Sequence, residues 1–283
     1  MKILEGYADP ATTYDLSYLA LGAGVQSSAL LLICEEPELR ELYGAPEIDV
    51  AVFADVGGEL PYTLEYLDYL KTVSKTRIEI VRAGNLETEY LELMEGGRTR
   101  ASQIPAYTKD GEARGMMPRT CTYDKKIVPM MRFIRTELGF KPRQRMAGNV
   151  KVRCLMGISL DEAIRMKPSV NKWQDNDYPL CDARITREKC LAIMREYGWE
   201  EPRRSSCYFC PYRTDKGWLY LQKEEPEIFA EAVEFDKKIR NHPKLRSEVY
   251  LHKSCKPLGE VELDNGQMEF SFMGDECSGH CGV

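Results

Sequence analysis

The sequence lacks any run of about 18 consecutive apolar residues, so we expect no membrane-spanning helix. Residues 1–15 contain no basic segment followed by an apolar core, which argues against a signal peptide. Internal repeats and low-complexity segments are also absent. These absences argue against a membrane-spanning helix and against a repeat protein. We therefore expect a cytoplasmic globular protein, and 283 residues are enough for one large domain or two smaller ones.

A strong positive charge is missing too. The net charge of −6 excludes a surface that binds polyanions throughout, although local basic patches remain compatible with it. Five basic residues could serve a nucleic acid, a nucleotide phosphate or only solvent: Arg98, Arg100, Lys109, Arg114 and Arg119. Cysteine, by contrast, is plentiful. In a reducing compartment, ten cysteines favour metal binding or redox chemistry over structural disulfides.

Hydrophobic patterning predicts an α/β fold. Apolar runs at residues 17–21, 48–53 and 77–81 are typical of buried strands, and helical periodicity lies between them. Strands that alternate with helices predict a doubly wound, mainly parallel sheet. We expect a nucleotide-binding α/β domain over residues 1–170. A helical, cysteine-rich region with a mobile tail over residues 171–283 should pack on it as one unit.

Two longer segments add to this outline. Residues 96–119 are polar and aperiodic, which is typical of an active-site loop or a mobile connection. Residues 159–168 are expected to form a short helix that Ser159 caps, with an exposed ion pair between Glu162 and Arg165.

The turn after the first predicted strand is the main candidate for a ligand site. Small residues there let the backbone approach a ligand, and the serines stand at the positive end of the next helix. Such a place binds phosphate, although the same pattern also suits a tight connection. The candidate nucleotide-binding residues are Gly22, Ala23, Gly24, Val25, Gln26, Ser27 and Ser28.

The second predicted strand ends in a polar segment that runs from Asp55 to Glu59. In parallel sheets, ligands bind beyond the carboxyl ends of the strands, so this segment should lie beside the phosphate loop. Asp55 can accept hydrogen bonds from a ribose or hold a metal ion. A helix-capping or turn aspartate is the simpler alternative.

The cysteines divide into clustered and isolated ones. Cys207 and Cys210, with two residues between them, form a metal-binding knuckle or a redox pair. Cys121 stands near a predicted helix start, which favours a thiolate or a metal-bound sulfur. Cys277 and Cys281 flank a histidine in the last seven residues and are either reactive thiols or accessory ligands. Four cysteines have no partner at metal spacing and are expected to be structural: Cys34, Cys154, Cys181 and Cys255.

Together these segments resemble the PP-loop ATP pyrophosphatase superfamily, and within it the phosphoadenosine-phosphosulfate (PAPS) reductase-like family. Residues 22–27 are similar to its Ser-Gly-Gly-x-Asp-Ser loop, and residues 53–63 to its Phe-x-Asp-Thr-Gly-x-Glu-x-Pro-x-Thr segment. Residues 121–129 resemble Cys-Cys-x-x-x-Lys-x-x-Pro. Residues 178–210 resemble the arrangement in iron–sulfur sulfonucleotide reductases, and residues 276–283 resemble the family's mobile Glu-Cys-Gly-x-His tail.

Some departures of this chain from the family pattern bear directly on the proposed site. Gly22 and Gln26 stand where the family loop has Ser and Asp, and Thr122 replaces the second cysteine of the Cys-Cys pair. The backbone cradle for phosphate needs neither of the two loop side chains. The missing cysteine, however, leaves a four-thiolate cluster one ligand short.

The resemblance implies a cofactor and a nucleotide. It implies ATP or a PAPS-like nucleotide on the loop, with Mg²⁺ as an accompanying ion. Phosphate charge would be neutralised by Lys125 or Lys126 and by Arg165. It also implies a [4Fe-4S] cluster held by Cys121, Cys207 and Cys210, with zinc as the alternative metal. Cys190 is the first candidate for the fourth ligand and Cys277 or Cys281 the next. A buried helix thiol is the alternative reading of Cys190.

Three functions follow from this resemblance. The first is adenylation of an acceptor by ATP for sulfur transfer, with tRNA or DNA as the acceptor and a sulfur-donor protein as partner. The second is a sulfonucleotide reductase in which Cys277 is the nucleophile, Cys281 resolves the disulfide and a thiol protein is the reductant. The third is a zinc-stabilised nucleotide- or nucleic-acid-binding protein without catalysis.

Overall fold

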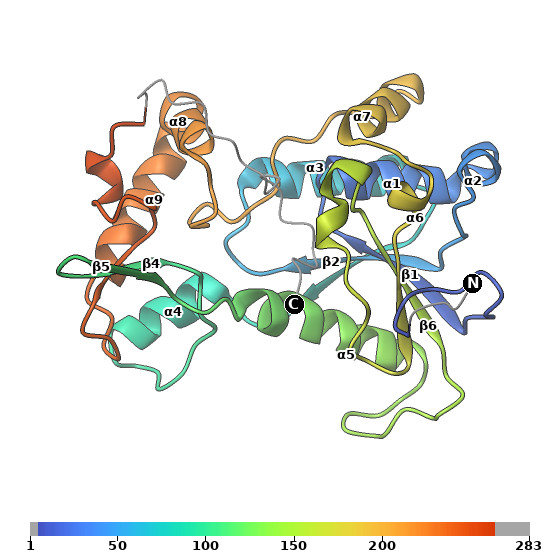
Figure 1. Cartoon of the computed structure of the whole chain (residues 1–283), viewed down its shortest axis with the longest axis horizontal. Helices are drawn as coiled ribbons and strands as arrows, with labels where there is room; N and C mark the ends of the chain where they lie inside the picture. Colours follow the sequence, from blue (N-terminus) through green and yellow to red (C-terminus); the bar gives the residue numbers. More distant parts are fainter. Residues whose placement is uncertain (1–4, 264–283) are drawn as a thin grey trace.

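The computed structural model describes residues 5–263, which form two lobes (Figure 1). The larger lobe contains a five-stranded sheet in the order β3-β2-β1-β6-β7, with every neighbouring pair parallel. Long apolar runs form the central strands because both of their faces are buried. The predicted α/β class is confirmed. The strands are β1 (Leu16–Leu21), β2 (Val50–Asp55), β3 (Ile78–Arg82), β6 (Val152–Met156) and β7 (Gln174–Asp177).

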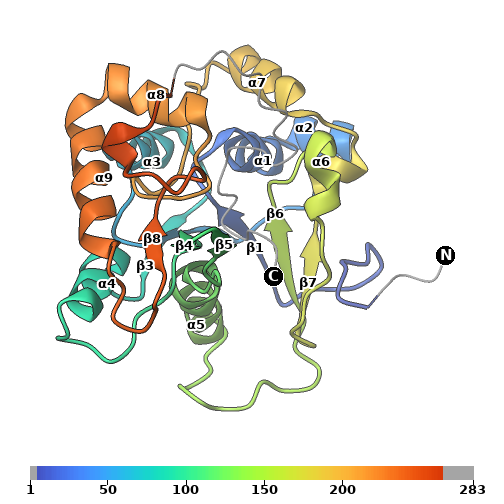
Figure 2. The same cartoon turned by 60° about the vertical axis from the view of Figure 1, so that its left-hand side comes forward.

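Helices cover both faces of this sheet (Figure 2). Alternate residues of β1 point to opposite faces, so that Leu19 and Leu21 join one hydrophobic cluster and Tyr18 and Ala20 join another. The helices over the first face are α1 (Val25–Glu35), α2 (Pro37–Tyr43), α3 (Pro61–Val73), α6 (Pro179–Asp182) and α7 (Arg187–Glu196). A π-helical turn, η1 (Tyr123–Ile127), leads into α5 (Val128–Glu137) on the second face.

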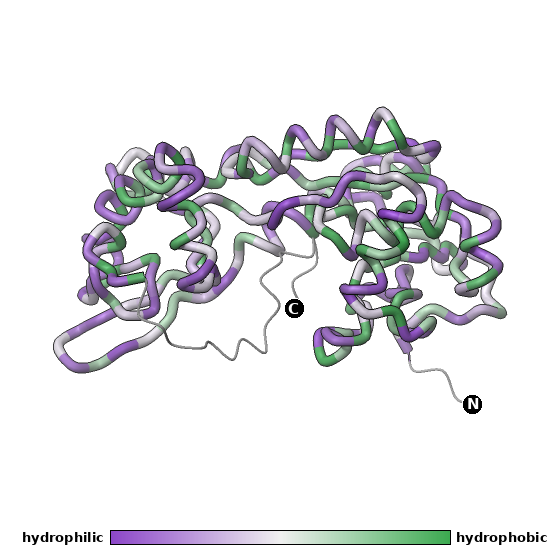
Figure 3. Tube along the Cα trace, turned by 90° about the horizontal axis from the view of Figure 1, so that it is seen from above, coloured by the Kyte–Doolittle hydropathy of each residue, from purple (hydrophilic) through white to green (hydrophobic). Residues whose placement is uncertain are grey.

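The smaller lobe has its own hydrophobic cluster and a three-stranded antiparallel sheet in the order β5-β4-β8. Figure 3, the view from above, separates the two lobes clearly. The strands are β4 (Tyr107–Asp110), β5 (Ala113–Met116) and β8 (Glu248–Tyr250). The helices are α4 (Leu86–Met94), α8 (Asp215–Glu224), α9 (Pro226–Ile239) and the 3-10 turn η3 (Leu258–Glu260).

The expectation of an irregular connection over residues 96–119 is wrong for its second half. Residues 107–116 form the β4–β5 hairpin, and β4 also pairs with β8. The hairpin escaped the sequence analysis because all four residues of β5 are exposed and give no apolar alternation. The strand that stabilises β4, moreover, lies more than 130 residues away in the sequence.

Both lobes draw on both halves of the chain. Strand β7 and helix α7, which follow residue 170, complete the larger lobe, whereas β8 pairs with β4 in the smaller one. No helix within residues 5–263 has the length and apolar character needed to cross a bilayer.

Candidate functional site

The predicted phosphate loop lies at the centre of the larger sheet. It follows β1, which pairs with β2 on one side and with β6 on the other. The strand order reverses at β1, and open α/β sheets bind ligands at such a switch point, beyond the carboxyl ends of the strands. The loop therefore lies at the carboxyl edge of the sheet, where the sequence analysis placed it.

Two backbone N–H groups of the loop converge on one oxygen atom. Ser27 Oγ accepts hydrogen bonds from the N–H of Gly22 at 3.2 Å and from the N–H of Gly24 at 3.4 Å. Ala23 between them has a φ of +52°, in the left-handed region. Successive N–H groups around a left-handed residue form a concavity that binds anions. In this chain the Ser27 hydroxyl oxygen occupies that concavity, and α1 begins directly after Gly24.

Segments from two distant parts of the sequence hold the loop in place. A Cβ atom on Gly157 would lie 2.6 Å from the backbone nitrogen of Ser27, so only glycine fits at that position. From the other side, the buried Ser205 donates a hydrogen bond to the carbonyl oxygen of Gly22 at 2.5 Å. The loop is thus fixed by the turn after β6 and by the cysteine-containing segment.

Gln26 and Arg165 meet at one carboxylate. Gln26 Nε2 donates to Glu162 Oε2 at 3.1 Å, and Arg165 Nη1 forms an ion pair with the same oxygen at 2.6 Å. The ion pair expected between residues 162 and 165 is confirmed, but Glu162 is buried rather than solvated. Ser159 begins the 3-10 turn η2 (Leu160–Arg165) without a side-chain capping bond, and instead its Oγ accepts from Gln26 at 3.4 Å.

Asp55 ends β2, and both of its carboxylate oxygens have partners. Oδ1 accepts from the N–H of Gly57 at 2.8 Å, and Oδ2 forms an ion pair with Arg82 at the end of β3. The turn contact is the simpler alternative that the sequence offered for this residue. Asp55 nevertheless borders a large cavity, so that a role toward a ligand is compatible with its position.

This cavity has a volume of about 990 Å³ and lies between the carboxyl ends of β2 and β3 and the start of α9. Its size is at the upper end of the range of small-molecule sites. Carboxylates dominate its charged lining, and Arg82 is the cation among them. The acidic lining residues are Asp55, Glu59, Glu87, Glu225, Glu227 and Glu231.

Lys125 has a buried ammonium group with two partners. Its Nζ donates to the carbonyl oxygen of Ala83 at 2.5 Å and forms an ion pair with Glu89 Oε1 at 2.7 Å. These contacts fix Lys125 against the turn between β3 and α4. A contact with phosphate would require Lys125 to exchange a buried partner for it.

The cysteine knuckle lies directly against the segment that follows β2. Cys207 forms a β-bridge with Glu59, and the N–H of Tyr208 donates to the carbonyl oxygen of Gly58 at 3.0 Å. The N–H of Cys210 donates to the carbonyl oxygen of Cys207 at 3.1 Å, which closes the knuckle. The structure therefore brings Cys207 next to the cavity wall, a proximity that the sequence could not give.

The buried Arg213 forms hydrogen bonds with the backbone and side chain of the knuckle segment. Arg213 donates to Ser206 Oγ at 2.9 Å and to the carbonyl oxygen of Cys207 at 3.1 Å. Burial lowers the pKa of Arg213 to about 10, with a further decrease from the charge of Arg204, while the thiols of Cys207 and Cys210 act in the opposite direction.

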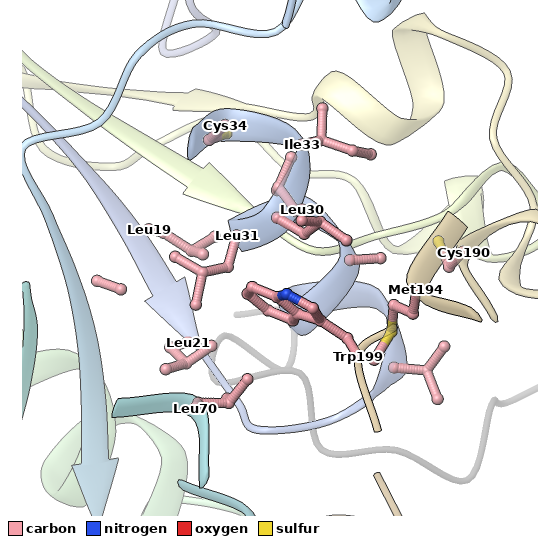
Figure 4. Packing of buried hydrophobic residues seen from close by; sticks show 14 of the residues in the cluster. Leu19, Leu21, Leu30, Leu31, Ile33, Cys34, Leu70, Cys190, Met194 and Trp199 are labelled. Carbon is pink, nitrogen blue, oxygen red and sulfur yellow. The ribbon is translucent and has the colours of Figure 1, made fainter. Parts of the chain in front are cut away.

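The other two predicted ligands within the described residues, Cys121 and Cys190, lie in different hydrophobic clusters. Cys121 packs against the same hydrophobic cluster as Cys207, and Arg119 nearby stacks on Tyr212 at 5.1 Å. Cys190 is fully buried in the cluster of the larger lobe, close to Met194 and Trp199 (Figure 4). Within residues 5–263, no three His, Cys, Asp or Glu side chains are grouped so as to hold a metal ion. Cys277 and Cys281 lie outside the described residues.

Four further residues of the site were not recognised as such from the sequence. Arg82 ends β3, and Gly157 and Glu162 follow β6, so their position at carboxyl ends of strands was a usable signal. Ser205 contacts a residue 183 positions away and carried no local signal.

Comparisons with known proteins found likeness in structure alone. No family model matches the chain, and no curated protein matches it in sequence. The chain is similar to a phosphoadenylyl-sulfate (PAPS) reductase from Candida auris, solved as a phosphate complex, with 12% identity and a TM-score of 0.42 over 67% of this chain and 76% of that one. It is also similar to the U34-tRNA thiolase NcsA from Methanococcus maripaludis, solved with its [4Fe-4S] cluster. There the identity is 12% and the TM-score 0.37, over 93% of this chain and 86% of that one. Likeness of this degree does not assign the chain to a family.

Proposed function

We propose that this protein is a PP-loop enzyme that binds an adenine nucleotide at residues 22–28 and activates an acceptor by adenylation for sulfur transfer. The observation that carries the proposal is the convergence of the Gly22 and Gly24 N–H groups on Ser27 Oγ. A phosphate oxygen is a stronger acceptor than a hydroxyl and would take the same two donors. The start of α1 adds its positive end to that position.

The cavity at the carboxyl ends of β2 and β3 suits the rest of such a nucleotide. Its carboxylates can accept hydrogen bonds from ribose hydroxyls and from the amino group of adenine. The same carboxylates repel phosphates, which therefore belong at the loop. In the proposed reaction an oxygen of the acceptor attacks the α-phosphorus of ATP, the acceptor–AMP bond forms and pyrophosphate leaves. Arg165 and Lys125 remain candidates for neutralising the phosphates, with Mg²⁺ as an accompanying ion.

We also propose a thiolate centre at Cys207 and Cys210, with Cys121 as a further ligand. The closed backbone of the knuckle supports this assignment, because the N–H of Cys210 and the guanidinium of Arg213 both donate to the carbonyl oxygen of Cys207. Cys190 lies in another hydrophobic cluster, so additional ligands are better sought at Cys277 and Cys281. The described ligands do not complete a site, and no step of the adenylation passes through the metal.

The acceptor is proposed to be a tRNA or a DNA, with a sulfur-donor protein as partner. Reduction of a sulfonucleotide, with a thiol protein as reductant, is the competing reaction. A zinc-bound protein without catalysis is the third outcome. The experiment below separates these three.

The test is anaerobic purification followed by two parallel incubations. One contains ATP and is assayed for AMP and pyrophosphate, with and without bulk tRNA or DNA; the other contains PAPS and reduced thioredoxin and is assayed for sulfite. We expect pyrophosphate from the first incubation and loss of it in Gly157→Ala, whose added methyl would displace the loop at Ser27, with Gly148→Ala as the control. Sulfite would replace the proposal by a reductase. Absence of both products would leave a binding protein.

A further inference from the structure

Gln26, which stands where the PP-loop pattern has Asp, has two side-chain partners from a distant part of the chain. Gln26 is 3% exposed, and its Nε2 donates to Ser159 Oγ and to Glu162 Oε2. Both partners belong to the turn after β6, more than 130 positions along the chain. They reach the loop because β6 is the direct neighbour of β1 in the sheet.

The carboxylate of Glu162 is buried, at 7% exposure, and has a charged partner. Arg165 Nη1 lies 2.6 Å from Oε2 and supplies the compensating charge. A buried carboxylate without such a partner would be neutralised by a proton instead. The Glu162 carboxylate thus joins two groups, the amide of Gln26 and the guanidinium of Arg165.

We propose that Glu162 is a positioning residue for the nucleotide loop. Residues 26 and 162 form a hydrogen-bonded pair in which only one of the two side chains can be a carboxylate. The proposal rests on the function proposed above, and it adds a constraint on which side chains can stand together at positions 26 and 162. Two ionised carboxylates about 3 Å apart cannot coexist in a buried site, as in the aspartic-protease dyad. An acid at position 162 therefore requires a neutral donor at position 26, and the amide of Gln26 meets this requirement.

The pairing fixes the first turn of α1. Gln26 is the second residue of this helix, whose opening N–H groups face the place proposed for phosphate. Holding its side chain against Ser159 and Glu162 sets the rotation of that turn. Gly157 limits the same turn through its close approach to Ser27. Glu162 acts on the ligand through the loop and need not touch it.

A charge exchange between the two positions tests this constraint. Four proteins are compared: the wild type, Gln26→Glu, Glu162→Gln and the double variant. Gln222→Glu, an exposed substitution on α8, adds a carboxylate elsewhere as a control. Binding of α,β-methylene-ATP is measured by titration calorimetry across a pH series, and thermal unfolding is recorded without ligand.

The expected result is rescue. At about pH 8 the Gln26→Glu variant should bind at least about tenfold more weakly, because repulsion between two carboxylates displaces the first turn. Lowering the pH should restore its binding, since one proton shared by the pair removes the repulsion. The double variant should bind within about threefold of the wild type at both pH values, because the amide now at position 162 can donate to the carboxylate now at position 26. The control should match the wild type.

Other results would overturn the proposal. If the double variant binds as weakly as Gln26→Glu, the carboxylate at position 26 acts directly on the nucleotide and Glu162 positions nothing. Unchanged nucleotide binding by the Gln26→Glu variant would also reject the proposal, because two carboxylates would then be tolerated at positions 26 and 162. A wild type that binds no nucleotide rejects the proposed function and the pairing constraint together, whereas a binding wild type without rescue rejects the constraint alone.

Discussion

Ser205 donates a hydrogen bond to the carbonyl oxygen of Gly22 across 183 positions of sequence, at 2.5 Å. Ser205 stands two residues before Cys207, and Gly22 opens the proposed phosphate loop. The bond therefore connects the thiol-bearing segment directly to the centre of the parallel sheet. A substitution that displaces one of these two segments should therefore displace the other.

Replacement of Ser205 by alanine should destabilise the protein. It leaves the buried Gly22 carbonyl without this donor, a loss that costs about 1–3 kcal/mol. Denaturant unfolding of Ser205→Ala measures this cost, and Thr136→Ala, an exposed hydroxyl deletion on α5, should change the unfolding free energy by less than about 0.5 kcal/mol. Equal changes in the unfolding free energy of the two variants would show that the hydrogen bond from Ser205 to Gly22 does not stabilise the protein.

Replacement of Gly157 by alanine should damage the loop more than the fold. The new methyl group would lie 2.6 Å from the nitrogen of Ser27, and overpacking of this kind costs about 1–3 kcal/mol. We expect nucleotide binding to be lost while the circular dichroism spectrum is retained. The matched control is Gly148→Ala, since a Cβ there meets nothing within 4 Å. A Gly157→Ala variant that binds like the wild type would contradict the proposed place of the phosphate.

The thiolate centre is tested by metal analysis of cysteine variants. Cys207→Ser should lower the iron or zinc content of anaerobically purified protein to background, because thiolates are the proposed ligands. Cys190→Ala should keep the wild-type metal content, since that thiol packs among aliphatic side chains of the other lobe. An absorption band near 400 nm distinguishes an iron–sulfur cluster from zinc. Full metal content in Cys207→Ser would remove the knuckle from the ligand set.

Asp177 should make stability depend on pH. Burial raises the pKa of this carboxyl from 3.8 to about 6, and Arg153, at 3.6 Å, opposes the increase only in part. Because the folded state binds the proton more tightly, this stabilising contribution is complete below the unfolded pKa of about 4 and is lost as the pH rises through about 6. Asp177→Asn should therefore gain stability relative to the wild type as the pH increases from about 4 to about 7. Denaturant unfolding at several pH values measures the difference, and a constant difference across this window would contradict the assignment.

The sequence by itself determined the central architecture. Runs such as that of β2, buried at every position, are long enough and apolar enough to require a sheet covered on both faces. The loop at Gly22 and the knuckle at Cys207 are local patterns, recognisable because their chemistry depends on neighbours in the chain. The order of strand and helix then placed Asp55 and the loop at one edge of the sheet.

Only the tertiary structure decided how these parts meet. Gln26 and Glu162 are 136 positions apart, and nothing local indicates that one amide and one carboxylate share a buried hydrogen bond. The sequence analysis offered Lys125 as a partner for phosphate, whereas in the structure the ammonium group of Lys125 forms an ion pair with Glu89 at 2.7 Å. Spacing along a chain fixes contacts within a helix or a turn. Contacts between elements depend on which strands become neighbours, and that is settled by the packing of the whole core.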